Sequence, residues 1–152
     1  MEYELGTIRV EAEILEENPI KITDFNDLLS RYRELGKNTS ESLYAVYLDQ
    51  DNCRIGDQRI GKGDHKSVAF NFTEILRTAA LVNAAGTIIV HNHPSGNPAP
   101  TSKDIKTTEE LHQALDQIGV ELLDHVIIAR NNELSMRGNQ DGPFTNTEKT
   151  TT

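Results

Sequence analysis

Hydrophobic and polar positions follow two different periods in the first part of the chain. From residue 7 to residue 14, apolar and polar side chains alternate strictly, which is the period of a half-buried β-strand. Residues 24–35 instead carry apolar side chains at helical spacing, between a capping Asp24 and a terminating Gly36. The pattern therefore predicts a strand over 7–14 and a helix over 24–35.

Short apolar runs and a helical segment follow in the middle of the chain. The run 43–48 and the segment 53–56 flank the polar stretch 49–52, an arrangement typical of a β-hairpin. Residues 73–85 are rich in good helix formers, and Gly86 closes them. We therefore expect a hairpin followed by a helix over 73–85.

The remaining pattern alternates between strands and helices. The short apolar run 87–90 is typical of a central strand that is covered on both faces. A loop rich in Pro and Gly, 94–100, separates it from a helix predicted over 102–118. A strand over 126–129 and a last short strand near 134–136 follow. This alternation predicts an α/β domain in which helices flank one mixed sheet.

A length of 152 residues suits one domain. We expect 1–40 to supply an N-terminal strand and helix to the same domain that continues through 41–138. The tail 139–152 is polar and rich in Thr, so we expect it to be disordered. No apolar run approaches the ~20 residues that cross a bilayer, and the N-terminus lacks the pattern of a signal peptide. We therefore expect a cytoplasmic protein.

Charge and cysteine content narrow the classes of function. The chain has 15 Lys and Arg against 24 Asp and Glu, a formal net charge of −9. Because affinity for nucleic-acid phosphates comes from cationic contacts, we do not expect direct binding of nucleic acid. The single cysteine, Cys53, cannot form a cysteine-based zinc cluster. Any metal site must therefore use histidines and carboxylates.

The segment from His91 to Asp104 contains the residues best suited to chemistry. His91 and His93 lie two apart at the end of the predicted strand 87–90, so their side chains point to the same side. Asp104 lies in the first turn of the next helix, and the loop between is long enough to return a carboxylate to the histidines. Two His, one Asp and an open position suit a catalytic zinc site.

Each of these features also has a simpler explanation. A pair of histidines on an exposed strand edge is more often solvated or packed than bound to metal. Thr101 and Asp104 fit the N-cap pattern, in which a hydroxyl accepts from an N–H of the first turn and an acidic residue three positions on reaches back. From the residues alone, capping and metal ligation both stay open.

The same segment resembles the signature of the JAB/MPN (JAMM) metalloenzyme domains, H-x-H-P followed by S-x-x-D, and in particular their RadC-like branch. That branch typically has H-N-H-P-S-G-x-P-x-P-S-x-x-D, and this chain departs from it only where Thr101 replaces the serine. The resemblance extends from roughly Glu41 to Met136. It implies the mixed sheet-and-helix fold of the JAB/MPN domains, which is similar to the cytidine deaminase arrangement.

The resemblance also implies roles for individual residues. His91, His93 and Asp104 would bind Zn²⁺, with a water at the fourth position. Zinc lowers the pKa of such a water toward ~7. Glu41, at the start of the predicted hairpin, matches the family glutamate that activates this water. Deaminase activity is not expected, because its signature requires cysteines that are absent here.

Three further residues need an interpretation. Thr101 keeps the hydroxyl with which the family serine donates a hydrogen bond to the charge on the attacked carbonyl, but it adds a methyl group. Glu74 is the rival to Glu41 as base, although a negative charge at a helix start is favourable without any catalysis. We expect His125, at the start of a strand, to support the site rather than to bind metal.

The resulting hypothesis is a zinc-dependent hydrolase that cleaves a peptide, isopeptide or related amide bond in a peptide or protein substrate. The alternative is a non-catalytic, zinc-containing module for DNA-repair accessory function or protein interaction. The predicted strand over 7–14 could pair with another copy at a sheet edge, which would give a homodimer.

Overall fold

The structure, a computed structural model, describes residues 20–63 and 72–138. The predicted strand over 7–14, and with it the pairing that a homodimer would use, lies outside the described residues. The tail over 139–152 lies outside them too, so its predicted disorder stays a prediction.

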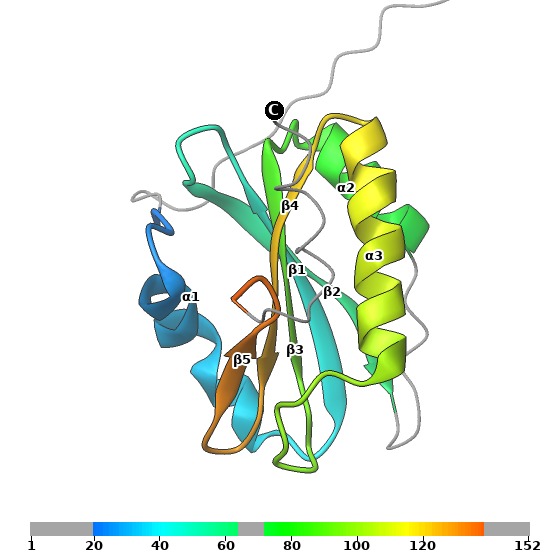
Figure 1. The fold of residues 1–152 in the computed structure, drawn as a ribbon. Coiled ribbons are helices and arrows are strands. Elements are labelled where there is room, and N and C mark those ends of the chain that lie inside the picture. The colour runs from blue at the N-terminus through cyan, green and yellow to red at the C-terminus, as the bar shows by residue number, and fades with distance from the viewer. Residues whose placement is uncertain (1–19, 64–71, 139–152) are drawn as a thin grey trace, which may run out of the picture.

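A five-stranded mixed sheet forms the middle of the domain (Figure 1), with the strand order β2-β1-β3-β4-β5. β1 pairs antiparallel with both β2 and β3, β3 pairs parallel with β4, and β5 closes the far edge antiparallel to β4. The prediction of one mixed sheet flanked by helices is confirmed. The strands are β1 (Glu41–Leu48), β2 (Arg54–Gly63), β3 (Gly86–Asn92), β4 (Glu121–Ile128) and β5 (Glu133–Ser135).

Helices cover both faces of this sheet (Figure 1). α1 (Phe25–Tyr32) begins at a capping box formed by Asp24 and Asp27 and packs on one face. α2 (Phe72–Leu81) and α3 (Ser102–Gln117) pack on the other face. α3 makes the crossover between β3 and β4, which a parallel pair requires. No helix in the described segments is long and apolar enough to cross a membrane.

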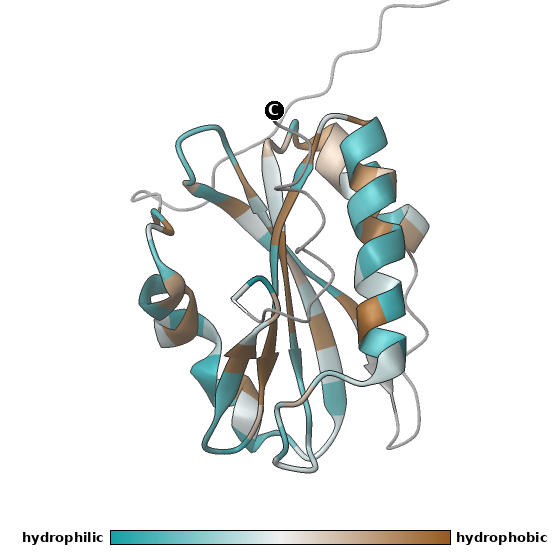
Figure 2. Ribbon diagram, viewed as in Figure 1, coloured by the Kyte–Doolittle hydropathy of each residue, from teal (hydrophilic) through white to brown (hydrophobic). Residues whose placement is uncertain are grey.

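The alternation of side chains along β1 and β3 divides the core in two. The helices on both sides of the sheet carry hydrophobic residues among hydrophilic ones (Figure 2). Leu43 and Ile89, at odd positions, pack against α2 and α3. Val46 and Val90, at even positions, pack against α1. Odd positions at the ends of the same strands therefore face α3, and His91 is among them. The core pattern thus sets which face of the sheet carries the candidate site.

Some predicted boundaries were wrong for reasons of tertiary contact. The second helix ends at Leu81 rather than at residue 85. Asn83 takes a left-handed conformation with φ 52°, and the amide of Ala85 donates to the carbonyl of Leu48, so these residues already lead into the sheet. β4 begins at Glu121, five positions before the predicted strand over 126–129, because its half-exposed start lacks a continuous apolar run.

The helix predicted over 24–35 is also interrupted. α1 stops at Tyr32, and a 3₁₀ helix, η1 (Arg33–Lys37), continues the chain. At Gly36 a Cβ atom would lie 2.6 Å from the carbonyl oxygen of Ala129. The tighter turn therefore brings the backbone at Gly36 against the end of β4, a contact that only glycine allows.

Candidate metal centre

Four chemically active side chains converge beside the N-terminus of α3. The Nε2 atoms of His91 and His93 are 2.8 Å apart. Asp104 places Oδ1 at 3.5 Å from His91 Nε2 and Oδ2 at 3.3 Å from His93 Nε2. Glu41 places Oε1 at 3.7 Å from His91 Nε2. We call Glu41, His91, His93 and Asp104 the candidate cluster. The structure thus brings together all three predicted ligands and the predicted base.

The buried side chain of Asn92 holds the start of β1 in place. Its Oδ1 accepts from the amide of Ser42 at 2.7 Å, and its Nδ2 donates to the carbonyl of Ser40 at 3.0 Å. These two bonds bracket Glu41, which faces His91 across the strand pair. The sequence pattern did not predict this role, because the two partners of Asn92 lie 50 and 52 positions away along the chain.

The loop after β3 orients the ring of His93. Gly96 has a φ of 86°, in the left-handed region, and its amide donates to the carbonyl of His93 at 3.1 Å. The carbonyl of Asn97 lies 3.0 Å from Nδ1 of His93 and accepts from it. Ser95 accepts from the amide of Asn97 at 3.3 Å and so helps to shape the loop. The loop thereby directs Nε2 of His93 into the candidate cluster.

Thr101 and Asp104 form a capping box at the start of α3. Thr101 Oγ1 accepts from the amide of Asp104 at 3.1 Å, and Asp104 Oδ2 accepts from the amide of Thr101 at 2.8 Å. The capping interpretation is therefore confirmed. The same carboxylate also faces both histidines, so capping and metal ligation are compatible. Thr101 is exposed, and its hydroxyl keeps a proton to donate, so its role toward a substrate stays a prediction.

The structure places His125 next to His91 and Glu74 next to Gln58. His125 is buried, and its Nε2 lies 2.6 Å from Nδ1 of His91, on the side of that ring away from the cluster. This contact agrees with a supporting role. Glu74, in the first turn of α2, accepts a hydrogen bond from Gln58 Nε2 at 2.9 Å instead of contacting the histidines. The geometry thus favours Glu41 over Glu74 as the base.

Burial and neighbouring charges shift the pKa values of the two carboxyl groups in opposite directions. Burial raises the pKa of Glu41, and the charge of Asp104 adds to this against the opposing effect of His93. Burial alone would also raise the pKa of Asp104, but hydrogen bonds from His93 and Thr101 and the nearby His91 hold it well below its usual range. Asp104 is therefore the carboxylate that stays ionised, whereas Glu41 takes up a proton more readily.

The two histidines of the cluster also differ. Burial, together with His125, lowers the pKa of His91 well below its ordinary value. At His93 burial acts in the same direction, but Asp104 and the carbonyl of Asn97 outweigh it and raise the pKa. These surroundings thus favour a positive charge between the two Nε2 atoms. A proton on Nε2 of His93 is one such charge. A metal ion in the same place would be another.

The donors fit a zinc ion better than a magnesium or calcium ion, because two imidazole nitrogens and a carboxylate are typical zinc ligands. Two ligand atoms of a tetrahedral zinc stand roughly 3.3–3.6 Å apart. The separations of the carboxylates from the histidines, 3.3–3.7 Å, are close to this range. The ligand atoms of Glu41, His91 and His93 also lie within 4.8 Å of one another. The cluster can therefore hold one metal ion once the histidines separate slightly.

With this geometry in place, comparison with known families identifies the domain. The sequence profile of the family described as the RadC-like JAB domain matches residues 22–141. The chain belongs to this family. The resemblance seen in the segment from His91 to Asp104 is confirmed, and the mixed sheet with helices on both faces is that of a RadC-like JAB domain.

Relatives of this RadC-like JAB domain carry the name UPF0758 protein. The chain is 38% identical to one from Finegoldia magna over 104 residues, which are 68% of this chain and 47% of the relative. It is 38% identical over 121 residues to one from Methanococcoides burtonii, 77% and 52% of the two chains. A relative from Coprothermobacter proteolyticus is 32% identical over 136 residues, 88% and 58%. The chain thus spans about half the length of the relatives it matches.

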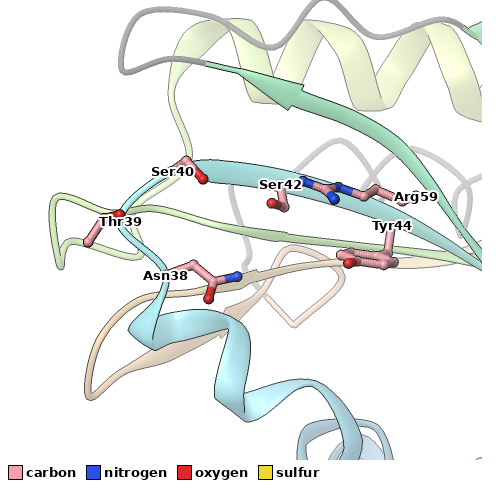
Figure 3. A pocket seen from close by; sticks show the side chains of 6 residues that line it. All are labelled: Asn38, Thr39, Ser40, Ser42, Tyr44 and Arg59. Atoms are coloured by element: carbon pink, nitrogen blue, oxygen red, sulfur yellow. The ribbon is translucent and has the colours of Figure 1, made fainter.

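The RadC-like JAB domain also has a cavity of about 260 Å³ on the face of β1 opposite the candidate cluster. Figure 3 shows the side chains that line it. Ser42 and Tyr44, at even positions of β1, line it from the α1 side, and the ring of Tyr44 lies near that of Tyr32. Glu41, at an odd position, faces α3 instead. The cavity and the cluster therefore share β1 without forming one site. The lining residues are Asn38, Thr39, Ser40, Ser42, Tyr44 and Arg59.

Proposed function

We propose that this RadC-like JAB domain is a zinc-dependent hydrolase of the JAMM type that cleaves a peptide, isopeptide or related amide bond. One observation carries the proposal. Two histidine Nε2 atoms lie 2.8 Å apart, and carboxylate oxygens from two further elements lie 3.3–3.7 Å from them. Three separate elements, β1, the end of β3 and the start of α3, supply these groups. Such convergence exceeds what capping or packing requires.

The two carboxylates receive different roles in this proposal. Asp104, whose pKa is held low, is the anionic ligand beside His91 and His93. Glu41, whose pKa is raised by burial, is the general base. A base is most effective when its pKa lies near the working pH, so a raised carboxyl pKa suits this task.

Bound zinc would polarise the carbonyl of the substrate and lower the pKa of a water toward ~7. Glu41 takes a proton from the attacking water as the oxygen of that water adds to the carbonyl carbon. The same carboxyl then gives this proton to the amine as the C–N bond breaks. Thr101, at the rim, donates a hydrogen bond from its hydroxyl to the charge that develops on the carbonyl oxygen. The products are a carboxylic acid and an amine.

The partner that fits this chemistry is a peptide or protein with an accessible amide or isopeptide bond. A net charge of −9 does not favour binding to nucleic-acid phosphates, so we propose no direct nucleic-acid contact. We also propose a cytoplasmic location. Because the chain spans about half of its relatives, these proposals concern the RadC-like JAB domain itself.

The test of the proposed function begins with a peptide and isopeptide library presented to zinc-loaded protein. For a cleaved member, Glu41→Gln preserves side-chain size and leaves His91, His93 and Asp104 unchanged. We expect turnover to fall by ~10²–10⁴-fold, the usual effect of removing a positioned base. Zinc content by elemental analysis should stay at one ion per chain.

Glu74→Gln is the matched control, because it makes the same chemical change at a glutamate that is also partly buried but lies in the first turn of α2, away from the histidines. Its oxygen can still accept from Gln58, so turnover should stay within about twofold. Collapse of turnover in the Glu74 variant with normal turnover in the Glu41 variant would assign the base to Glu74. Zinc binding without cleavage of any library member would instead favour the non-catalytic module.

A further inference from the structure

A continuous line of hydrogen bonds runs behind the candidate cluster, from α3 through β4 to β3. Nδ1 of His91 lies 2.6 Å from Nε2 of His125. Nδ1 of His125 lies 2.6 Å from Oγ1 of Thr108. Oγ1 of Thr108 lies 2.6 Å from the carbonyl oxygen of Asp104. All of these groups are buried, and at 2.6 Å no water fits between them, so each contact is a direct hydrogen bond. We call Thr108, His125 and His91 the relay.

The direction of every bond in the relay follows from its far end. A carbonyl oxygen only accepts, so the contact between Thr108 and Asp104 uses the single hydroxyl proton of Thr108. The oxygen of Thr108 must then accept from His125, which places a proton on Nδ1 of His125. A neutral imidazole with its proton on Nδ1 has a lone pair on Nε2. That lone pair accepts from His91, which places the proton of His91 on Nδ1.

The consequence appears at the other nitrogen of His91. With its proton on Nδ1, the ring presents a lone pair at Nε2, toward His93, Asp104 and Glu41. His93 complements this state. Its Nδ1 donates to the carbonyl of Asn97, and a proton on its Nε2 fills the 2.8 Å contact with Nε2 of His91. The Nε2 lone pair of His91 is therefore directed into the candidate cluster, as ligation of a metal ion requires, and a metal ion would take the place of the proton on Nε2 of His93.

We propose that Thr108 and His125 are positioning residues that hold His91 in its metal-binding tautomer. This inference rests on the proposed zinc site for its purpose, but the tautomer itself is a property of the protein without metal. Neither residue touches the substrate or the metal. Partners of this kind behind a ligating histidine typically contribute 10–100-fold to metal affinity. In this site a second histidine and a threonine would make this contribution, whereas the partner behind a ligating histidine is usually a carboxylate, a backbone carbonyl or water.

The test uses four variants of the full chain. His125→Leu fills the space but offers no acceptor to His91. His125→Gln offers an amide oxygen to His91 and an amide N–H to Thr108, so it should rescue. Thr108→Val keeps the shape and removes the hydroxyl that sets the direction. Thr107→Val makes the same change one position earlier on α3, outside the relay, and is the matched control.

The first readout is the tautomer of each histidine in zinc-free, ¹⁵N-labelled protein at about pH 8, where an ordinary histidine is neutral, by long-range ¹H–¹⁵N correlation. We expect His91 and His125 to carry their proton on Nδ1, with Nε2 unprotonated, in the wild type and in the Thr107 variant. In the Leu variant, His91 should shift toward its Nε2–H form, and in the Gln variant it should not. A proton on Nε2 of His91 in the wild type would overturn the proposal, because the relay would then run in the opposite direction.

The second readout is zinc affinity by competition with a chelator. The Leu and Thr108→Val variants should bind zinc about 10–100-fold more weakly, whereas the Gln and Thr107→Val variants should stay near the wild type. Urea unfolding of the zinc-free proteins distinguishes a loss of zinc affinity caused by the tautomer from one caused by a packing defect. A packing defect would lower stability and leave the tautomer of His91 unchanged. Full zinc affinity in folded Leu and Val variants would overturn the proposal. The expected tautomers in a protein that binds no zinc would support the relay and refute the proposed function.

Discussion

Asp104 caps α3, and we propose that it also binds zinc, two roles that substitution can separate. Its Oδ2 accepts from the amide of Thr101 at 2.8 Å within the capping box, and the same carboxylate lies 3.3 Å and 3.5 Å from the two histidine nitrogens. Thr101→Ala removes the hydroxyl that accepts from the amide of Asp104, together with a methyl group, and leaves the carboxylate of Asp104 in place. Asp104→Asn keeps an oxygen for the amide of Thr101 but removes the negative charge from the candidate cluster. We therefore predict that both variants lose stability, and that only one loses zinc.

The magnitudes follow from the contacts. Loss of an N-cap hydroxyl costs about 0.5–2 kcal/mol, and 1 kcal/mol lowers the Tm of a domain of this size by about 2–4 °C. Loss of a negative charge from the first turn of a helix costs about 0.3–1 kcal/mol, so the zinc-free Asn variant should have a similar Tm. For zinc, Thr101→Ala should change affinity by no more than about twofold. Asp104→Asn should weaken it by more than the ~100-fold that loss of an outer partner can cause.

Thermal unfolding with and without zinc measures both effects in one assay. At a free zinc concentration of 100 times Kd, wild type and Thr101→Ala should gain about 2.7 kcal/mol. A hundredfold weaker site gains only about 0.4 kcal/mol at the same concentration. If Asp104→Asn gains as much from zinc as the wild type does, the carboxylate is a helix cap alone and the ligand assignment is refuted.

Three further predictions concern the scaffold. Gly36→Ala should lower the free energy of unfolding by about 1–3 kcal/mol in urea, because the added Cβ would lie 2.6 Å from the carbonyl oxygen of Ala129; unchanged stability would contradict this contact. Thr87→Val should raise it by about 1 kcal/mol, since the buried hydroxyl has no hydrogen-bond partner among the described residues; a loss would reveal a partner. Burial and a 2.6 Å hydrogen bond to Asp57 raise the pKa of Tyr32. The folded state therefore keeps the phenolic proton of Tyr32 at a pH at which the unfolded state loses it. The free energy of unfolding should consequently fall as the pH rises above about 10. Tyr32→Phe should flatten that alkaline fall in pH-dependent urea titrations, and an equally steep fall would contradict the assignment.

Local patterns were sufficient for much of this domain. The apolar run 87–90 predicted β3, and the Thr101–Asp104 pair predicted a capped helix, because both signals lie within one turn or one strand. The predicted ligands came together because a strand end, a short loop and a helix start are adjacent in sequence. Their spacing alone therefore limits how far apart they can fold.

Other parts depend on contacts that sequence spacing does not contain. Glu41 and Glu74 both begin an element, and only the pairing of Leu43 with His91 places Glu41 beside the histidines. Thr108 lies one helical turn after Asp104, which puts both on one face of α3, yet its partner His125 is 17 positions away on β4. Asn92 reaches the backbone of Ser42 across 50 positions. Register between strands, which these contacts require, is set by the whole core.

We propose that His91, His93 and Asp104 bind one zinc ion while Glu41 remains available as a base. Anomalous scattering at the zinc edge, from crystals of zinc-loaded protein, locates this ion. We predict one peak about 2.0–2.2 Å from Nε2 of both histidines and from an oxygen of Asp104, with Glu41 beyond bonding distance. A peak bonded to Glu41 in place of Asp104, or the absence of any peak between the two histidines, would contradict it.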